Sequence, residues 1–169
     1  LVKCSFEMGK AKTGALIVLE KNTKLTEYIR TGIELDSLVT SQLLLNIFEH
    51  NTPLHDGAII VRGNRIISAT CYLPLSDNME LSKELGTRHR AGVGISEVTD
   101  SLTIIVSEET GKVSIAQKGV LTRDVTPEEL KEQLVTIKDK NVNTKRFKFW
   151  KGKGKNEENI NQNKENIDQ

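Results

Sequence analysis

The chain has 169 residues, of which 37% are hydrophobic and 28% charged, a length and composition that suit one globular domain with a single core. Lys and Arg total 24 against 23 Asp and Glu, so the net charge of +1 excludes a general electrostatic attraction to nucleic acid. No apolar run approaches the roughly 20 residues that span a bilayer. The cysteines, Cys4 and Cys71, form no CxxC pattern and are interpreted as reduced thiols, with Cys71 in the core.

The first part of the chain shows helical and strand patterns in turn. Residues 1–12 carry a weak helical pattern. Residues 14–20 form a β-branched apolar run, typical of a central strand that is buried on both faces. Thr40 or Ser41 can begin a helix that runs through Glu49, because apolar side chains recur there at helical spacing. We expect this helix to pack on the sheet.

Two β-hairpins are predicted further along the chain. The first joins residues 57–62 to residues 65–73 through a two-residue Gly-Asn turn, which can adopt positive φ angles. The second joins residues 102–107 to residues 112–116 through a four-residue turn. Hairpins imply antiparallel pairing, so the predicted fold class is α/β, with a mixed, largely antiparallel, hairpin-built central sheet surrounded by helices.

Two more helices and a tail complete the predicted organisation. One helix covers about residues 82–98, and another begins at Thr126, where a hydroxyl is followed by proline and two acids. From about residue 141 the chain is rich in Lys, Asn, Glu and Gln, and it cannot bury enough apolar surface to offset its ordering entropy. We therefore divide the chain into an N-terminal helix at 1–12, a domain at 13–140 and a disordered tail at 141–169.

A turn before a predicted buried strand carries the first candidate chemical group. In the run NTPLHDGA at residues 51–58, Pro53 and Gly57 fix the turn, and Asp56 comes directly before the strand. Its carboxylate would stand at a sheet edge on a rigid base. The alternative is an ordinary turn in which Asp56 caps backbone amides.

The run ELGTRHRAG at residues 84–92 offers phosphate-binding groups. Glycine permits close approach of the backbone, Thr87 offers a hydroxyl, and the guanidinium groups of Arg88 and Arg90 match phosphate oxygens. The run has neither the spacing of a P-loop nor that of a dinucleotide-binding motif. The alternative is an exposed basic helix face.

The run SEETG at residues 107–111 is the third candidate. It places two carboxylates and a hydroxyl at a hairpin tip, where they could bind a hard divalent cation. An ordinary polar turn would have the same composition.

Together these three runs resemble the diadenylate cyclase family, whose marks are the motif DGA, here residues 56–58, and the motif RHR, here residues 88–90. The resemblance extends from about residue 14 to residue 125. It also includes TGI at 31–33, CYLPL at 71–75 and GISEVTD at 94–100. The subtype that the chain is most similar to is the membrane-anchored CdaA type. Residues 1–12 would then be a leader from a missing membrane segment, and the rest a cytoplasmic domain of a protein anchored in the cell membrane.

The resemblance implies an activity: two ATP molecules condense into cyclic di-AMP and release two pyrophosphates. Each protomer of a homodimer would hold one ATP, and each 3′-hydroxyl would attack the α-phosphorus of the opposing nucleotide. A divalent metal (Mn²⁺, Mg²⁺ or Co²⁺) would assist, regulatory protein partners are possible, and nucleic acid has no role. The main alternative is a non-catalytic sensor that binds adenine nucleotides, and the presence of Asp56, Arg88 and Arg90 argues against it.

The resemblance also implies roles for individual residues. The catalytic residues would be Asp56, Gly57 and Arg88. The ATP-binding residues would be Tyr72, Leu73, Gly86, Thr87, Arg88, His89, Arg90, Ser107, Glu108 and Glu109. The metal ligands would be His55, Asp56 and Glu109. Tyr72 and Leu73 would line the adenine pocket, although both could instead be sheet core, and alternation along a strand would put them on opposite faces.

Outside the resemblance, the run KRFKFWKGKGK at residues 145–155 interleaves basic and aromatic residues. Such a run could bind nucleic acid or a membrane surface. The alternative is a solubilising disordered tail.

Overall fold

The computed structural model describes residues 1–82 and 85–137. The predicted disordered tail at 141–169 and its basic run lie outside these residues. Leu1–Leu130 forms one compact unit and Lys131–Gln169 a second, and the sheet belongs entirely to the first. In the described part of the chain, no helix has both the length and the apolar character needed to cross a membrane.

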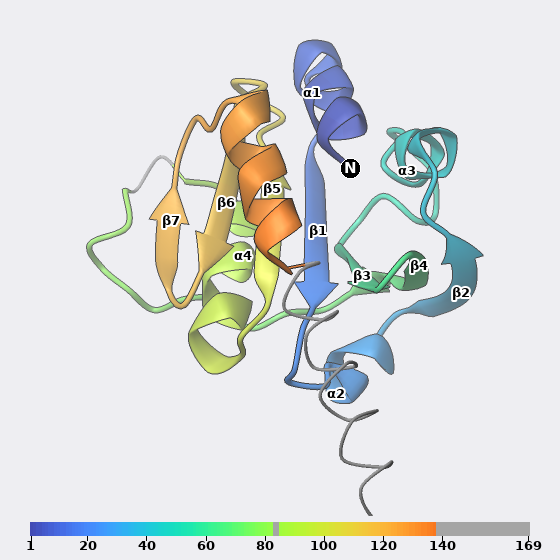
Figure 1. Cartoon of the computed structure of the whole chain (residues 1–169), viewed down its shortest axis with the longest axis horizontal. Coiled ribbons are helices and arrows are strands. Elements are labelled where there is room, and N and C mark those ends of the chain that lie inside the picture. Colours follow the sequence, from blue (N-terminus) through green and yellow to red (C-terminus); the bar gives the residue numbers. More distant parts are fainter. Residues whose placement is uncertain (83–84, 138–169) are drawn as a thin grey trace, which may run out of the picture. The chain divides into compact units, whose positions relative to one another are not determined.

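A mixed seven-stranded sheet is the framework of the first unit (Figure 1). The strands are β1 (Ala15–Glu20), β2 (Ile33–Leu38), β3 (Ala58–Arg62), β4 (Arg65–Cys71), β5 (Leu102–Val106), β6 (Val113–Gln117) and β7 (Val120–Thr122). Their order across the sheet is β2-β4-β3-β1-β5-β6-β7. β1 runs parallel to β3, and every other pair is antiparallel. The predicted fold class and both predicted hairpins are therefore confirmed.

The helices are α1 (Val2–Ala11), α2 (Thr26–Ile29), α3 (Ser41–Ile47) and α4 (Thr87–Val98), and residues 127–137 are also helical. At α3 the Thr40 hydroxyl accepts a hydrogen bond from the Leu43 amide, as expected of an N-cap. The helix ends at Ile47, two residues before the predicted end at Glu49. At the last helix, Thr126 and Glu129 form a reciprocal capping box, which confirms its predicted start.

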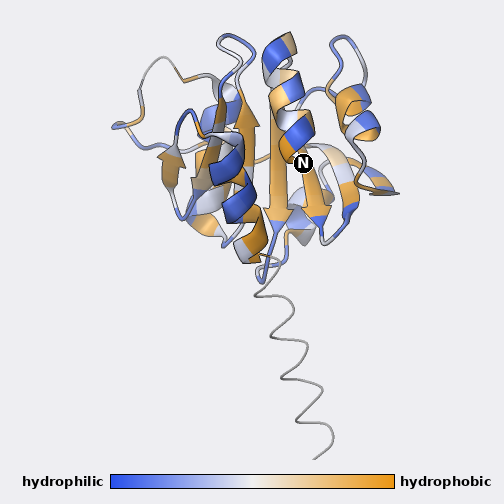
Figure 2. Ribbon diagram, turned by 45° about the horizontal axis from the view of Figure 1, so that its top comes forward, coloured by the Kyte–Doolittle hydropathy of each residue, from blue (hydrophilic) through white to orange (hydrophobic). Residues whose placement is uncertain are grey.

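The core is built around β1, whose six residues are all buried. Leu16 and Val18 belong to a cluster that includes Val93 and Ile95 of α4, while Ile17 alternates with them and faces the other side of the sheet. In Figure 1, α4 lies behind the sheet, and in Figure 2 the central strands are coloured as hydrophobic. The prediction of a central strand buried on both faces is confirmed.

α4 begins later than the sequence pattern predicts. The predicted helix starts at about residue 82, whereas the observed one starts at Thr87, after an extended Gly86 with φ −71° and ψ 176°. Residues 83–84 lie outside the described part of the chain. The delayed start leaves Gly86 and the first turn of α4 beside the cavity described below.

Three elements were not predicted: α2, β2 and β7. β2 is an edge strand whose six residues are all exposed or half-buried, so it lacks an apolar pattern. Its register shifts between Glu34 and Ser37, and Asp36 there takes a φ of 41° and forms an ion pair with Arg65. Such irregular, charged edge strands resist pairing with other chains, and they are hard to recognise by alternation.

Candidate active site

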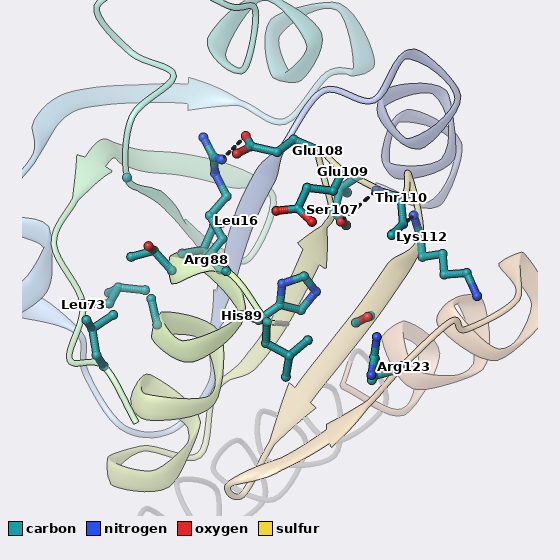
Figure 3. A pocket seen from close by; sticks show the side chains of 18 of the residues that line it. Leu16, Leu73, Arg88, His89, Ser107, Glu108, Glu109, Thr110, Lys112 and Arg123 are labelled. Carbon is teal, nitrogen blue, oxygen red and sulfur yellow. Dashed lines mark hydrogen bonds and ion pairs between the residues drawn. The ribbon is translucent and has the colours of Figure 1, made fainter. Parts of the chain in front are cut away.

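A cavity of about 640 Å³ lies at the edge of the sheet where β1 and β3 begin and β4 and β5 end. This volume is typical of a pocket for a small molecule or nucleotide. Side chains from the turn before β3, the segment after β4, the start of α4 and the hairpin between β5 and β6 line it. Figure 3 shows this cavity from close by.

The cavity brings together most of the residues assigned from the sequence. Those that line it are Asp56, Gly57, Tyr72, Leu73, Gly86, Thr87, Arg88, His89, Ser107, Glu108 and Glu109. Two assigned residues, His55 and Arg90, are not among the lining residues. Three runs that lie far apart in the sequence therefore share one hollow.

The turn before β3 presents Asp56 to the cavity without a partner. The side chain is exposed, and it forms no hydrogen bond or ion pair with any residue that the structure describes. The carboxylate therefore does not cap backbone amides there, which was the alternative interpretation. The next residue, Gly57, has a φ of 99°, and a Cβ atom at this position would lie 2.9 Å from the Thr70 carbonyl carbon. Only glycine fits this turn.

An ion pair between α4 and the second hairpin closes one side of the cavity. Arg88 Nη1 lies 2.5 Å from Glu108 Oε2, as Figure 3 shows, and Arg88 Nη2 donates to the His55 carbonyl at 3.5 Å. Arg88 Nε is buried without a hydrogen-bond partner among the described residues. At Gly14 a Cβ atom would lie 2.7 Å from both paired atoms, so glycine there lets the pair lie against the start of β1.

His89 contributes a buried, neutral ring to the wall. Burial lowers the pKa of the imidazole, the positive charge of Arg123 lowers it further, and the negative charge of Glu109 opposes this effect only in part. The ring is therefore uncharged at neutral pH. One of its ring nitrogens can donate a hydrogen bond and the other can accept one, but the ring adds no positive charge.

The two arginines of the RHR motif point in different directions. Residues two positions apart on a helix are separated by about 200°, so they do not share a face. Arg88 lines the cavity, and Arg90 does not. The Arg90 carbonyl accepts a hydrogen bond from the Ser76 amide at 3.0 Å. The role in ATP binding that the resemblance implies for Arg90 is not tested by these contacts, and the lining of the cavity favours Arg88.

The three predicted metal ligands do not form a cluster. Within residues 1–82 and 85–137, no three His, Cys, Asp or Glu side chains gather as a metal site. His55 Nδ1 lies 2.6 Å from the Thr52 carbonyl oxygen, whereas Asp56 and Glu109 both line the cavity. One or two carboxylates completed by substrate phosphates are the usual donors for Mg²⁺, so this cavity fits a cation that arrives with a nucleotide. The metal assignment stays a prediction.

Tyr72 and Leu73 follow β4 instead of ending it, because the strand stops at Cys71. Tyr72 is 74% exposed, and its backbone amide donates to the Thr31 hydroxyl at 2.9 Å. Leu73 is half-buried and packs against the core. Leu16, Leu73 and Leu75 also make part of the cavity wall apolar, which suits a flat base. The strand alternation expected for Tyr72 and Leu73 is therefore wrong, although both line the cavity.

The sequence analysis missed three charged lining residues: Lys112, Arg123 and Asp124. Lys112 Nζ lies 2.5 Å from Asp124 Oδ2, and the Val125 amide donates to the Val113 carbonyl at 2.9 Å. These contacts bring the segment after β7 back to the second hairpin. Recognition of β7 as a third strand beside that hairpin would have revealed them.

The chain matches a family and several individual proteins. A family model described as DAC, DisA bacterial checkpoint controller nucleotide-binding, matches residues 2–121. The chain is 57% identical over 148 residues to the cyclic di-AMP synthase CdaA of Bacillus subtilis, a match that covers 88% of this chain and 54% of that protein. It is 56% identical over 154 residues to a diadenylate cyclase of Listeria monocytogenes, covering 89% of this chain and 55% of that protein.

Solved structures show the same fold. A crystal structure of a double mutant of DacA from Staphylococcus aureus has a TM-score of 0.79 and 52% identity, covering 80% of this chain and 91% of that chain. A hypothetical membrane spanning protein from Bacillus cereus has a TM-score of 0.71 and 45% identity, covering 73% of this chain and 61% of that chain. The chain spans about half the length of the curated relatives it matches. On the match of the family model over most of its length, the chain belongs to the DAC (DisA bacterial checkpoint controller nucleotide-binding) family.

Proposed function

We propose that this chain is the catalytic domain of a diadenylate cyclase, which condenses two ATP molecules into cyclic di-AMP and releases two pyrophosphates. One observation carries the proposal: a cavity of nucleotide size combines the unpartnered Asp56 carboxylate with Thr87, Arg88 and Ser107. The names of the Bacillus subtilis and Listeria monocytogenes relatives support it.

The reaction consists of two equivalent displacements. In each, the 3′-oxygen of one ATP forms a bond to the α-phosphorus of the other, the bond from that phosphorus to the β-phosphate bridge breaks, and pyrophosphate leaves. The proton of the 3′-hydroxyl must be lost. Asp56 has no other partner among the described residues. We propose that its carboxylate accepts this proton or polarises the hydroxyl group that carries it.

The other lining residues would hold the phosphates. Gly86 and Thr87 stand at the N-terminus of the 12-residue helix α4, where free amides and the helix dipole favour anions. Arg88 and Ser107 add a guanidinium and a hydroxyl. Transfer at phosphorus gains chiefly from positioning and charge neutralisation, so this set needs no covalent intermediate.

A divalent cation, Mn²⁺, Mg²⁺ or Co²⁺, would neutralise phosphate charge and make the 3′-hydroxyl more acidic. We propose Asp56 and Glu109 as its protein ligands, because both carboxylates line the cavity. His55 would have to turn away from the Thr52 carbonyl to join them. We propose His55 as a third ligand, which such a turn of the ring would bring to the cation.

We propose a homodimer as the active form. The described part of one chain combines these groups in one cavity, whereas a cyclic product needs two bonds between two nucleotides. Two copies related by an isologous two-fold interface would meet that requirement. Specific activity should then fall when the enzyme is diluted below its dimer dissociation constant. Constant activity per subunit in a demonstrated monomer range would contradict the paired-site mechanism.

We also propose that residues 13–140 form the catalytic domain and that the full-length protein is anchored in the cell membrane, with this domain in the cytoplasm. The similarity to a protein described as membrane spanning supports the anchor. Regulatory protein partners could then act at the membrane. Fractionation of cells that express the full-length protein would test the location.

Incubation with ATP and Mn²⁺, followed by separation of the nucleotides by mass, tests the central proposal. Formation of cyclic di-AMP and pyrophosphate in a 1:2 ratio is the expected result. The second candidate, a sensor that binds ATP without chemistry, predicts ATP binding and no product. The unpartnered Asp56 favours the enzyme.

A further inference from the structure

The cavity wall carries three cationic side chains in the described part of the chain, and two of them already have partners. Arg88 is paired with Glu108, and Lys112 is paired with Asp124, each at 2.5 Å. Arg123 forms no ion pair or side-chain hydrogen bond with any described residue. Its full charge is therefore available to a ligand.

The backbone around Arg123 is held on the side that faces the second hairpin. Arg123 follows directly after β7. The next residue, Asp124, accepts from Lys112, and the Val125 amide donates to the Val113 carbonyl at 2.9 Å. These two contacts fix the backbone beside Arg123 at the cavity rim, so an anion that binds there need not order this segment of the main chain.

The Arg123 guanidinium acts on the interior of the cavity. Its positive charge lowers the pKa of the buried His89 ring, in addition to the effect of burial. Figure 3 shows Arg88 and Arg123 on opposite sides of His89. The hollow therefore has a cation on each side of a neutral imidazole.

The cavity also has ends of different polarity. Figure 3 shows Leu73 on one side, and Lys112 and Arg123 on the other. Glu109 and Thr110, in the turn that joins β5 to β6, also line the cavity. An elongated ligand with an apolar head and a charged tail would place its tail toward Arg123.

We propose that Arg123 binds the β- and γ-phosphates of ATP and holds the pyrophosphate as it leaves, an inference that rests on the proposed cyclase function. When the bond between the α-phosphorus and the bridging oxygen breaks, that oxygen keeps the bonding electron pair, and negative charge builds on pyrophosphate. A guanidinium binds two phosphate oxygens at once and keeps its charge at any working pH. It stabilises the leaving group most at the moment when the charge develops.

Binding of ATP, ADP, AMP and inorganic pyrophosphate to Arg123→Gln, measured by calorimetry, tests the inference. Glutamine keeps much of the side-chain length and removes the charge. Loss of a charge-assisted contact should weaken ATP and pyrophosphate binding about 10- to 100-fold, ADP binding less, and AMP binding less than about 2-fold. Arg30→Gln is the matched control, because Arg30 follows α2, is exposed and does not line the cavity. Arg123→Lys should recover part of the lost affinity.

Product formation by the wild-type protein is measured in parallel, so that the two proposals can fail separately. Equal weakening for AMP and ATP, or no weakening at all, overturns the role of Arg123 even if the wild type makes cyclic di-AMP. A graded loss that follows the number of phosphates supports that role even if no cyclic product forms. Failure of the wild-type protein to bind ATP or pyrophosphate overturns both proposals.

Discussion

The two ends of β1 use charged residues in opposite ways. At its C-terminal end the Glu20 carboxylate is fully buried and saturated: Arg62 donates two hydrogen bonds at 2.7 and 2.9 Å, and the Leu25 amide and Lys24 donate one each at 3.1 Å. All four contacts come from the protein itself. This cluster joins β1 to β3 and to the segment before α2.

At the N-terminal end of β1 some charged groups have no hydrogen-bond or ion-pair partner among the described residues. Arg88 meets Glu108 across Gly14, but its Nε is buried without a described partner. The same cavity contains Asp56 and Arg123, which have no ion pair with any described residue. The comparison separates charges that stabilise the fold from charges that are available to a ligand.

The largest effect is expected when the unpartnered carboxylate is neutralised. Asp56→Asn should lower cyclic di-AMP formation by roughly 10²- to 10⁴-fold, the usual range for loss of a group that moves a proton. ATP affinity without metal should change less than about 3-fold, because shape is retained. Mass analysis of the products and calorimetry check the two parts. Near-normal turnover would remove Asp56 from the reaction.

The two arginines of the RHR motif in α4 allow a charge that lines the cavity to be compared with a charge that does not. Arg88→Ala deletes a charge from the cavity wall and should weaken ATP binding about 10-fold or more. Arg90→Ala should change it less than about 3-fold, because Arg90 does not line the cavity. Titration of both variants with ATP decides between them. Equal losses would show that Arg90 also reaches the nucleotide.

Disruption of the Glu20 cluster at the C-terminal end of β1 should lower the stability of the fold and leave the enzymatic activity unchanged. Glu20→Gln keeps the volume but removes the charge that Arg62 binds, so the free energy of unfolding should fall by roughly 1–3 kcal/mol. Activity per folded molecule should stay within about 2-fold. Lys24→Gln, whose side chain is 65% exposed, should cost less than about 1 kcal/mol. Urea unfolding of both variants makes the comparison, and a loss of activity without loss of stability would contradict it.

The same carboxylate predicts a dependence of stability on acid. Burial alone would raise the pKa of Glu20, but the hydrogen bonds from Arg62, the Leu25 amide and Lys24 outweigh it and lower the pKa to about 2. Because the folded value lies below the unfolded value of 4.5, the stabilisation is present above about pH 4.5 and is lost as the pH falls toward 2. Its size is on the order of 3 kcal/mol. Unfolding curves should show a smaller acid-dependent loss in Glu20→Gln than in the wild-type protein.

The fold could be predicted where local patterns and tertiary structure agree. The apolar run at 14–20 and the two hairpin turns each indicate one structure, and each was found. β2 was not predicted, because an exposed edge strand needs no alternation of apolar and polar residues. The parallel pairing of β1 with β3 escaped because it joins residues such as Ile17 and Ile59 that no short turn connects.

The site could be predicted where a motif marks it. Asp56, Thr87 and Arg88 stand in such motifs, and they share one cavity. Arg123 stands in no motif, and only the return of the chain after β7 brings it to the wall. The direction of the side chains could not be predicted either, because the RHR motif does not indicate which of its arginines faces the cavity.

The central position of β1 also has a consequence during synthesis on the ribosome. Ile17 pairs with Ile59 of β3 on one side and with Ile104 of β5 on the other. β1 precedes both of these strands in the sequence, so it gains its second neighbour only after β5 has emerged. The two hairpins, by contrast, can close as soon as each is made, since local contacts form quickly. Until β5 has emerged, at least one edge of this apolar strand is open to other chains. The nascent protein therefore passes through a stage in which its future central strand has an unpaired, aggregation-prone edge.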